Sequence, residues 1–284
     1  MDLVALRTDL AFRAVFGRDN EKCKIALKEL LSISLDLDIH DLRYVNPLNL
    51  QEYEGDKQSE MDIEVETETG ELINVEIQLK TTKGFKQRIV YYGAKLLGEA
   101  LGEKETYDKL RECKVLSILD FILFPQTDAL VNRFCLKERE QNFEFSDVLE
   151  LVFMEMPKLQ EKAVTAMSPV EKWLYFLRYV QDEDKSEKIT AIIKESEGLQ
   201  MAYKVLSEVS ADRTLRTKIR FQEKAQRDHL SQLAYAEELG IKQGLEQGAK
   251  KTARNLLIHG MPPQTVAEMT ELTLAEVEAL QKSL

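Results

Sequence analysis

Residues 61–80 have the sequence MDIEVETETGELINVEIQLK, and this stretch decides the fold. Apolar and polar residues alternate in its two halves, 61–66 and 73–80, with the period of two expected for half-buried strands. Thr69-Gly70 lies between the halves and indicates the turn of a β-hairpin. One face of the hairpin then carries isoleucine, valine and leucine. The polar face carries Asp62, Glu64, Asn74, Glu76, Gln78 and Lys80.

The register of this hairpin follows from the alternation. Facing residues of an antiparallel pair lie on the same side of a sheet, and a loop centred near Thr69 places Asp62 opposite Glu76. Their Cβ atoms would be ~5 Å apart, where two like charges destabilise the sheet. A divalent cation between them would remove that conflict, since hard cations bind carboxylate oxygens. A solvated acidic face is the other interpretation, and the spacing alone leaves both open.

Further elements surround the hairpin in a fixed order. Apolar spacing predicts two helices before it and one helix after it, and a near-continuous apolar run predicts a strand covered on both faces. A strand interrupted by Pro47 is expected between the second helix and the hairpin. The ranges are 9–17 and 21–35 for the first helices, 42–50 for the interrupted strand, 85–96 for the helix after the hairpin and 115–124 for the buried strand.

These residues resemble the Rpn family of recombination-promoting nucleases and transposases, which belongs to the PD-(D/E)xK nuclease superfamily. The resemblance covers nearly the whole chain. It rests on the first helix, on Asp62 followed by the Glu76-Ile77-Gln78 motif, and on the elements after them in order. The Glu-x-Gln motif alone is weak, whereas the ordered set is specific. The resemblance implies an α/β fold with a restriction-endonuclease-like core of helix, three strands, helix and strand, followed by a C-terminal helical extension.

The resemblance also implies a site and a cofactor. Asp62 and Glu76 would bind Mg²⁺ or Mn²⁺ with the carbonyl of Ile77, and the ion would activate water for phosphodiester hydrolysis of DNA. The superfamily usually has lysine at the third motif position, where this chain has Gln78. Glutamine carries no charge and can only orient water by hydrogen bonding. The substitution puts the rate in doubt, although the Rpn family often has glutamine there.

Other residues near the motif admit two interpretations each. Lys80 would replace the missing lysine from the same strand face, or it is an ordinary strand-end lysine. Asp9 would be a third carboxylate, or an acid that favours the start of a helix. Arg88 and Tyr92 would face the site or only pack on their helix. Lys57 would meet phosphate or lie in a surface loop.

Composition limits the functional classes. The chain has 284 residues and a net charge of −11, which argues against indiscriminate binding of nucleic acid. From Arg213 to Arg254 the local balance is positive, with ten Lys/Arg and five Asp/Glu, which fits either an exposed charged helix or a contact with the DNA backbone. There is no run of about 18 apolar residues and no signal peptide, so we expect no membrane span and a cytoplasmic location. Three widely spaced cysteines are expected to be reduced thiols.

The chain divides into three predicted parts. Residues 1–180 form the nuclease-like domain, residues 181–252 a helical region with a glycine-repeat linker, and residues 253–284 a small helical tail. Glycines at 240, 244 and 248 predict a weak helix or a linker, and a homo-oligomer could form through this region. The tail resembles a helix-turn-helix, but its last helix carries Glu276 and Glu278, which favours interaction over base reading.

Two functions are carried forward. The first is a metal-dependent DNA endonuclease linked to recombination or mobile DNA, favoured by Asp62 and Glu76. The second is a nuclease-like fold retained as a DNA-binding or protein-interaction module with weak or no catalysis. Gln78, the acidic charge and the long helical tail favour the second.

Overall fold

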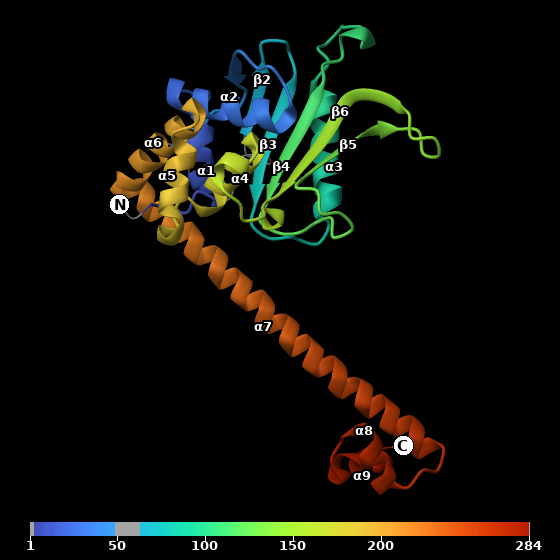
Figure 1. Cartoon of the computed structure of the whole chain (residues 1–284). Helices are drawn as coiled ribbons and strands as arrows, with labels where there is room; N and C mark the ends of the chain where they lie inside the picture. Colours follow the sequence, from blue (N-terminus) through green and yellow to red (C-terminus); the bar gives the residue numbers. More distant parts are fainter. Residues whose placement is uncertain (1–2, 49–62, 284) are drawn as a thin grey trace. The chain divides into compact units, whose positions relative to one another are not determined.

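The computed structural model describes residues 3–48 and 63–283. Within these ranges one mixed sheet of six strands has the order β1-β2-β3-β4-β6-β5 (Figure 1). The strands are β1 (Leu42–Tyr44), β2 (Ile63–Thr67), β3 (Leu72–Gln78), β4 (Cys113–Leu119), β5 (Val131–Lys137) and β6 (Glu144–Glu155). The helices are α1 (Asp9–Phe16), α2 (Glu21–Leu35), α3 (Phe85–Glu99), α4 (Pro169–Tyr179), α5 (Ser186–Ile193), α6 (Glu197–Ala211), α7 (Arg213–Ile258), α8 (Pro263–Thr270) and α9 (Leu274–Lys282). The α/β fold and the order helix, three strands, helix, strand are therefore confirmed.

The hairpin of β2 and β3 has the register that the alternation predicts. Ile63 faces Val75 and Glu64 faces Asn74 in an antiparallel ladder, and Gly70 in the turn has a φ of 98°. Asp62, which precedes Ile63, lies outside the described residues. From β3 the chain crosses through α3 to β4, which runs parallel to β3 and to β6.

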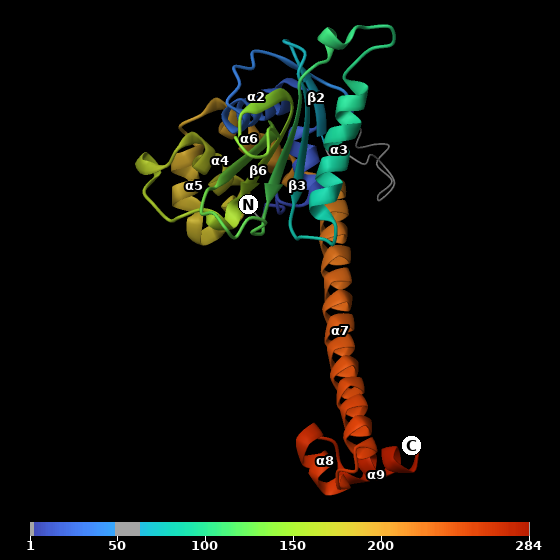
Figure 2. The same cartoon turned by 90° about the vertical axis from the view of Figure 1, so that its right-hand side faces the viewer.

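Different helices cover the two faces of the sheet. Figures 1 and 2 show α3 on one face, and helices including α1 and α4 form the core on the other face. The residues of β3 alternate between these layers, so that Ile73, Val75 and Ile77 join the core made with α1, α2, α4 and α6. Leu72 on the opposite face joins a second core under α3. Because both faces of β3 are covered, the polar side chains of Asn74 and Glu76 are buried as well. The interpretation of this hairpin face as a solvated acidic face is therefore wrong for these two residues.

Helix α3 approaches the sheet closely at one glycine. Gly93 is buried, and a Cβ added there would lie 3.1 Å from side-chain atoms of both Leu149 and Leu151 on β6. An added Cβ would therefore require these two leucine side chains to shift by a few tenths of an ångström. Gly93 lies in the middle of α3, between its buried Ile89 and Leu96.

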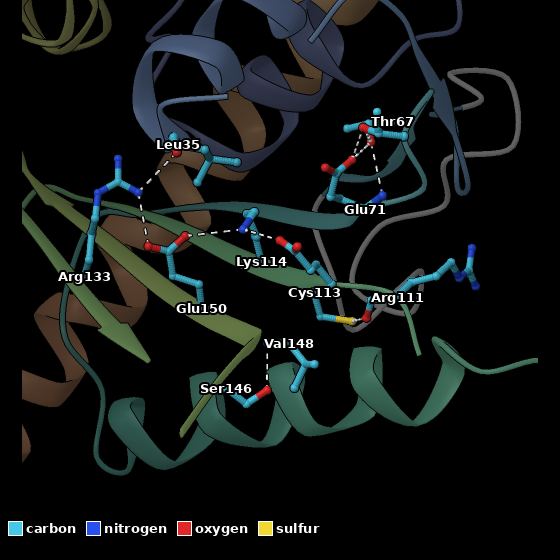
Figure 3. Close-up of polar contacts among 12 residues, drawn as sticks. Leu35, Thr67, Glu71, Arg111, Cys113, Lys114, Arg133, Ser146, Val148 and Glu150 are labelled. Carbon is cyan, nitrogen blue, oxygen red and sulfur yellow. Dashed lines mark hydrogen bonds and ion pairs between the residues drawn. The ribbon is translucent and has the colours of Figure 1, made fainter. Parts of the chain in front are cut away.

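Buried charge at the start of β4 is fully paired. Lys114 is buried and lies 3.0 Å from a carboxylate oxygen of Glu112 and 3.7 Å from one of Glu150. Arg133 on β5 pairs with the same Glu150 and donates to the carbonyl of Leu35 (Figure 3). These ion pairs satisfy a buried lysine at the end of β4 away from Gln78, so we assign them a structural role.

The chain divides into two compact units, Met1–Phe221 and Gln222–Leu284. The first unit includes α5 and α6, beyond residue 180 where the sequence pattern places the end of the nuclease-like domain. Helix α6 belongs to it because it packs on α1 and α2. Among the described residues no helix is both long and apolar enough to cross a membrane.

The second unit contains most of α7 with α8 and α9. Gly240, Gly244 and Gly248 lie inside α7, which agrees with the helix among the two alternatives, a weak helix or a linker, that the glycines left open. Helix α7 ends at Ile258 before Gly260, which has a φ of 81°. A small core then holds α8 and α9 against α7, and the side chain of Thr273 caps the start of α9 by accepting from the backbone N–H of Glu276. The core residues are Ala253, Leu257, Val266 and Val277.

Candidate functional site

Glu76 is the central residue of the candidate site. It lies on β3 facing α3, is only 4 % exposed, and stands opposite Ser117 of β4. The Ser117 hydroxyl donates to Oε1 of Glu76 at 3.3 Å. Burial raises the pKa of the Glu76 carboxyl, while Arg88 and the bond from Ser117 oppose the rise. A carboxylate that is costly to keep charged in the protein alone gains most from a bound cation.

Arg88 provides the positive charge beside Glu76. It lies in the first turn of α3, and its Nη2 is 4.0 Å from Oε2 of Glu76. The same Nη2 donates to Oε1 of Gln78 at 2.8 Å. The guanidinium carbon lies 5.2 Å from the centre of the Phe85 ring and 5.9 Å from that of Tyr92, which holds the side chain over the sheet. Arg88 therefore both packs on its helix and faces the motif.

Gln78 is held in one orientation by two hydrogen bonds. Its Oε1 accepts from Arg88, and its Nε2 donates to the carbonyl oxygen of Lys80 at 3.2 Å. Strand β3 ends at Gln78, so Lys80 lies in the bend that follows and is exposed. The prediction that Lys80 continues the polar face of the strand is wrong, because the strand ends two residues earlier.

The start of α1 lies near the end of β3. Arg7 pairs with Asp120, whose backbone N–H donates to the carbonyl of Gln78 at 2.9 Å. Asp9 follows in the first turn of α1 and is half-buried. Both interpretations of Asp9, as an additional carboxylate and as a helix-start acid, fit this position.

The carbonyl of Ile77 faces the opposite side of β3 from that of Gln78. Backbone carbonyls of a strand alternate in direction, and the carbonyl of Gln78 points toward β4. That of Ile77 is therefore turned toward the β2 side. The described part of β2 begins at Ile63, opposite Val75. The proposed ligand Asp62 and the candidate Lys57 lie outside the described residues.

Asn74 is a member of the site face that sequence reasoning did not single out. It is fully buried two residues before Glu76 on the same face, opposite Glu64. Neither its Oδ1 nor its Nδ2 has a hydrogen-bond partner among the described residues. Such a buried amide costs about 1–3 kcal/mol if it stays unsatisfied. The alternation of the hairpin already placed Asn74 on this face, but burial under α3 could not be seen from the hairpin alone.

The segment after β3 forms a basic surface next to the motif. Between Leu79 and Gly98 there are five Lys/Arg and no Asp/Glu, in a chain of net charge −11. Lys80, Lys83 and Lys86 are exposed in the loop and first turn that lead into α3. This basic loop, defined here as residues 79–86, is a second feature that sequence reasoning missed. The absence of acidic residues over the segment was the available signal.

Acidic, histidine and cysteine side chains do not gather in threes within the described part of the chain. The three cysteines are free thiols, as expected. A metal site at Glu76 therefore needs a ligand from outside the described ranges, such as Asp62, or ligands of another type, such as amide and carbonyl oxygens.

No curated protein and no solved structure matches the chain. A family model described as PD-(D/E)XK nuclease family transposase matches residues 6–236. The matched range begins just before α1, contains every strand of the sheet and ends within α7. It thus includes Glu76, Gln78 and Arg88. On this match, the chain belongs to the PD-(D/E)XK nuclease family transposases.

Proposed function

We propose that the protein is a metal-dependent endonuclease that hydrolyses phosphodiester bonds of DNA. Membership of a nuclease family of transposases supports a nuclease or transposase-like role. The observation that carries the proposal is Glu76, a carboxylate buried in the middle of a central strand with a raised pKa. Its nearest described counter-charge is Arg88, at the distance limit of an ion pair. Structural carboxylates at such depth are normally paired closely, as Glu155 is with Lys158 at 2.6 Å.

The residues present fit a hard divalent cation. The alternation of the sequence predicts Asp62, which lies outside the described residues, as the residue opposite Glu76. The two carboxylates and the carbonyl of Ile77 are oxygen donors of the kind that Mg²⁺ and Mn²⁺ prefer. Asn74 contributes a further buried oxygen on the same face. When bound, the ion supplies activation of water and neutralisation of charge on the phosphate.

Arg88 and Gln78 then have distinct tasks. Arg88 supplies the positive charge that a lysine supplies elsewhere in the superfamily, and its bond to Gln78 fixes the direction of the amide. Oε1 of Gln78 keeps a second lone pair that can accept from the attacking water and orient it. Gln78 cannot remove the proton from that water, since an amide is not a base at neutral pH.

The basic loop is the proposed contact with the DNA backbone. Its exposed lysines lie within a few residues of Gln78, where a phosphate must approach for cleavage. Phosphate contacts from lysine give affinity without sequence preference. The acidic remainder of the chain would limit binding elsewhere. A role in the movement or recombination of DNA fits the family and is part of the same proposal.

A binding function without catalysis is the second candidate. It is favoured by Gln78, whose two polar groups are both engaged within the protein and which brings no charge to the site. The two candidates share the fold and the DNA contact and differ only in whether phosphodiester bonds break.

Nicking of a supercoiled plasmid in Mg²⁺, Mn²⁺ or EDTA tests the proposal. We expect relaxed plasmid with either metal, none with EDTA, and none from Glu76→Gln or Asp62→Asn. Glu64→Gln is the matched control, because Glu64 is a half-buried acid of the same hairpin that is not assigned to the metal. Calorimetric titration with Mn²⁺ should show binding that both site variants lose and the control keeps. Metal binding without nicking would favour the second candidate, and nicking by Glu76→Gln would refute the first.

A further inference from the structure

One side of α7 in the second unit carries exposed apolar side chains beside three glycines. Leu233, Ile241 and Leu245 are 53 %, 59 % and 72 % exposed. At 100° per residue, Leu233 and Ile241 share a side of the helix with the glycines at 240, 244 and 248, and Leu245 lies at its edge. Cβ atoms added at these glycines would meet nothing within 4 Å.

This part of α7 needs packing to be a stable helix. Each glycine costs about 1 kcal/mol relative to alanine inside a helix. Most helical stability in proteins comes from burying an amphipathic face. Packing of another element into the open space beside the glycines would offset this cost in helix stability.

The charges around Gly244 are arranged with opposite signs at equal distances. Glu237 and Lys251 lie seven residues before and after it. The same relation holds for the two further pairs, which are Glu238 with Lys250 and Lys242 with Glu246. Every charged residue from 237 to 251 is matched in this way.

Contacts within one helix do not account for the outer pair. Glu246 does pair with Lys250 one turn later, at 2.5 Å. Glu237 and Lys251, however, have no oppositely charged residue three or four positions away on their own helix. Both lie on the same side as Leu233 and the glycines. A second helix running in the opposite direction would place an opposite charge beside each of them.

We propose that α7 pairs antiparallel with α7 of a second copy of this chain, about a two-fold axis at Gly244. Residues equally far before and after Gly244 then face each other, so Glu237 meets Lys251 of the partner subunit. Gly240 faces the partner's Gly248, which lets the helices approach closely. Ile241 lies level with the partner's residue 247, beside the space that the partner's Gly248 leaves open. In a parallel pair each charged residue would meet its own copy. The proposal does not depend on the proposed function, because it concerns only residues of the second unit.

Disulfide formation distinguishes the two directions. In the full chain with Cys135→Ser, Gly244→Cys should form a cross-linked dimer under mild oxidation, because the two copies meet at the axis. Gly240→Cys alone should not, since its two copies are about 12 Å apart along the helix. A mixture of Gly240→Cys and Gly248→Cys chains should cross-link. Self-linking of Gly240→Cys, or no link from Gly244→Cys, would overturn the arrangement.

Sedimentation equilibrium measures the dimer itself. The wild-type chain of 32.7 kDa should sediment at twice that mass. Glu237→Lys creates two like-charged pairs and should weaken the dimer about tenfold or more. Adding Lys251→Glu should restore it. Tyr235→Ala, an exposed aromatic on the far side of the helix, is the control and should change nothing. A wild-type monomer at about 100 μM, well above ordinary dimer constants, contradicts the proposal, as does failure of the double variant to recover.

Discussion

Arg88→Ala should destabilise the protein in a way that depends on pH. The variant loses the charge-assisted hydrogen bond from Arg88 to Gln78, at 2.8 Å, which contributes about 1.5–3 kcal/mol. It also loses the counter-charge of Glu76. At 4.0 Å and with the Arg88 side chain about one-third exposed, that ion pair contributes about 1 kcal/mol. The contacts with the rings of Phe85 and Tyr92 add about 0.5–1 kcal/mol.

The expected loss at pH 7 is therefore about 3–5 kcal/mol in the free energy of unfolding. For a unit of this size it corresponds to a fall in Tm of about 10 °C. The folded-state pKa of Glu76 is raised, so its protonation favours folding as the pH falls toward the ordinary glutamate range. Without Arg88 the pKa of Glu76 rises further, and the deficit of the variant should shrink between pH 7 and pH 5.

Urea unfolding, monitored by circular dichroism at pH 5 and at pH 7, measures the loss in the free energy of unfolding at each pH. Lys86→Ala is the matched control, because Lys86 is exposed two residues earlier on α3, and it should lose at most the roughly 0.5–1 kcal/mol of its contact with the Phe124 ring, equally at both pH values. In a Glu76→Gln background, Arg88→Ala should cost about 1 kcal/mol less. A loss that is the same at pH 5 and pH 7, and the same with Gln at position 76, would refute the coupling between Arg88 and Glu76.

Three further outcomes are expected. Gln78→Lys should lower both nicking and stability, because a lysine there would face the guanidinium of Arg88. Lys80→Ala should keep most of the nicking activity. Urea unfolding and plasmid nicking, measured on both variants, check these expectations. Lys83→Ala should weaken DNA binding uniformly across sequences and reduce the dependence of log K on log salt by about one unit, as fluorescence anisotropy would show. A chain ending near Arg254 should keep its nicking activity, since the motif lies in the first unit. Loss of all plasmid nicking in a truncated chain that is still well folded would contradict this expectation.

The fold was predictable where local patterns carry it. Alternation in the hairpin determines that Ile63 faces Val75, since a shift by one residue would turn every apolar side chain to the other face. The start of α9 is also carried locally, because Thr273 and Glu276 form a capping box within one turn. Strand β5 gave no such signal. It is an edge strand, its residues are mostly exposed or half-buried, and only its pairing with β6 defines it.

The site was predictable in its residues and not in its surroundings. Glu76 and Gln78 could be chosen from the motif, but the burial of Glu76 depends on how α3 packs over the sheet and on Ser117 of β4, which is 41 residues away in sequence. Arg88 could be named as a candidate, yet its bond to Gln78 depends on how closely α3 lies over β3. The glycines of α7 left both a weak helix and a linker open, because helix propensity is a local measure and says nothing about a partner.

The parallel pairing of β3 with β4 has a consequence for the order of folding. Glu76 and Ser117 are 41 residues apart in sequence and can meet only after α3 has crossed the sheet. Strand β4 gains its other neighbour only when β6, ending at Glu155, has been made. Folding through such long-range pairings is slow, because the entropy of loop closure is lost before the contacts between the strands form. In a growing chain Glu76 would therefore stay hydrated until most of the first unit has emerged. The residues proposed to cut DNA would come together only near the end of folding.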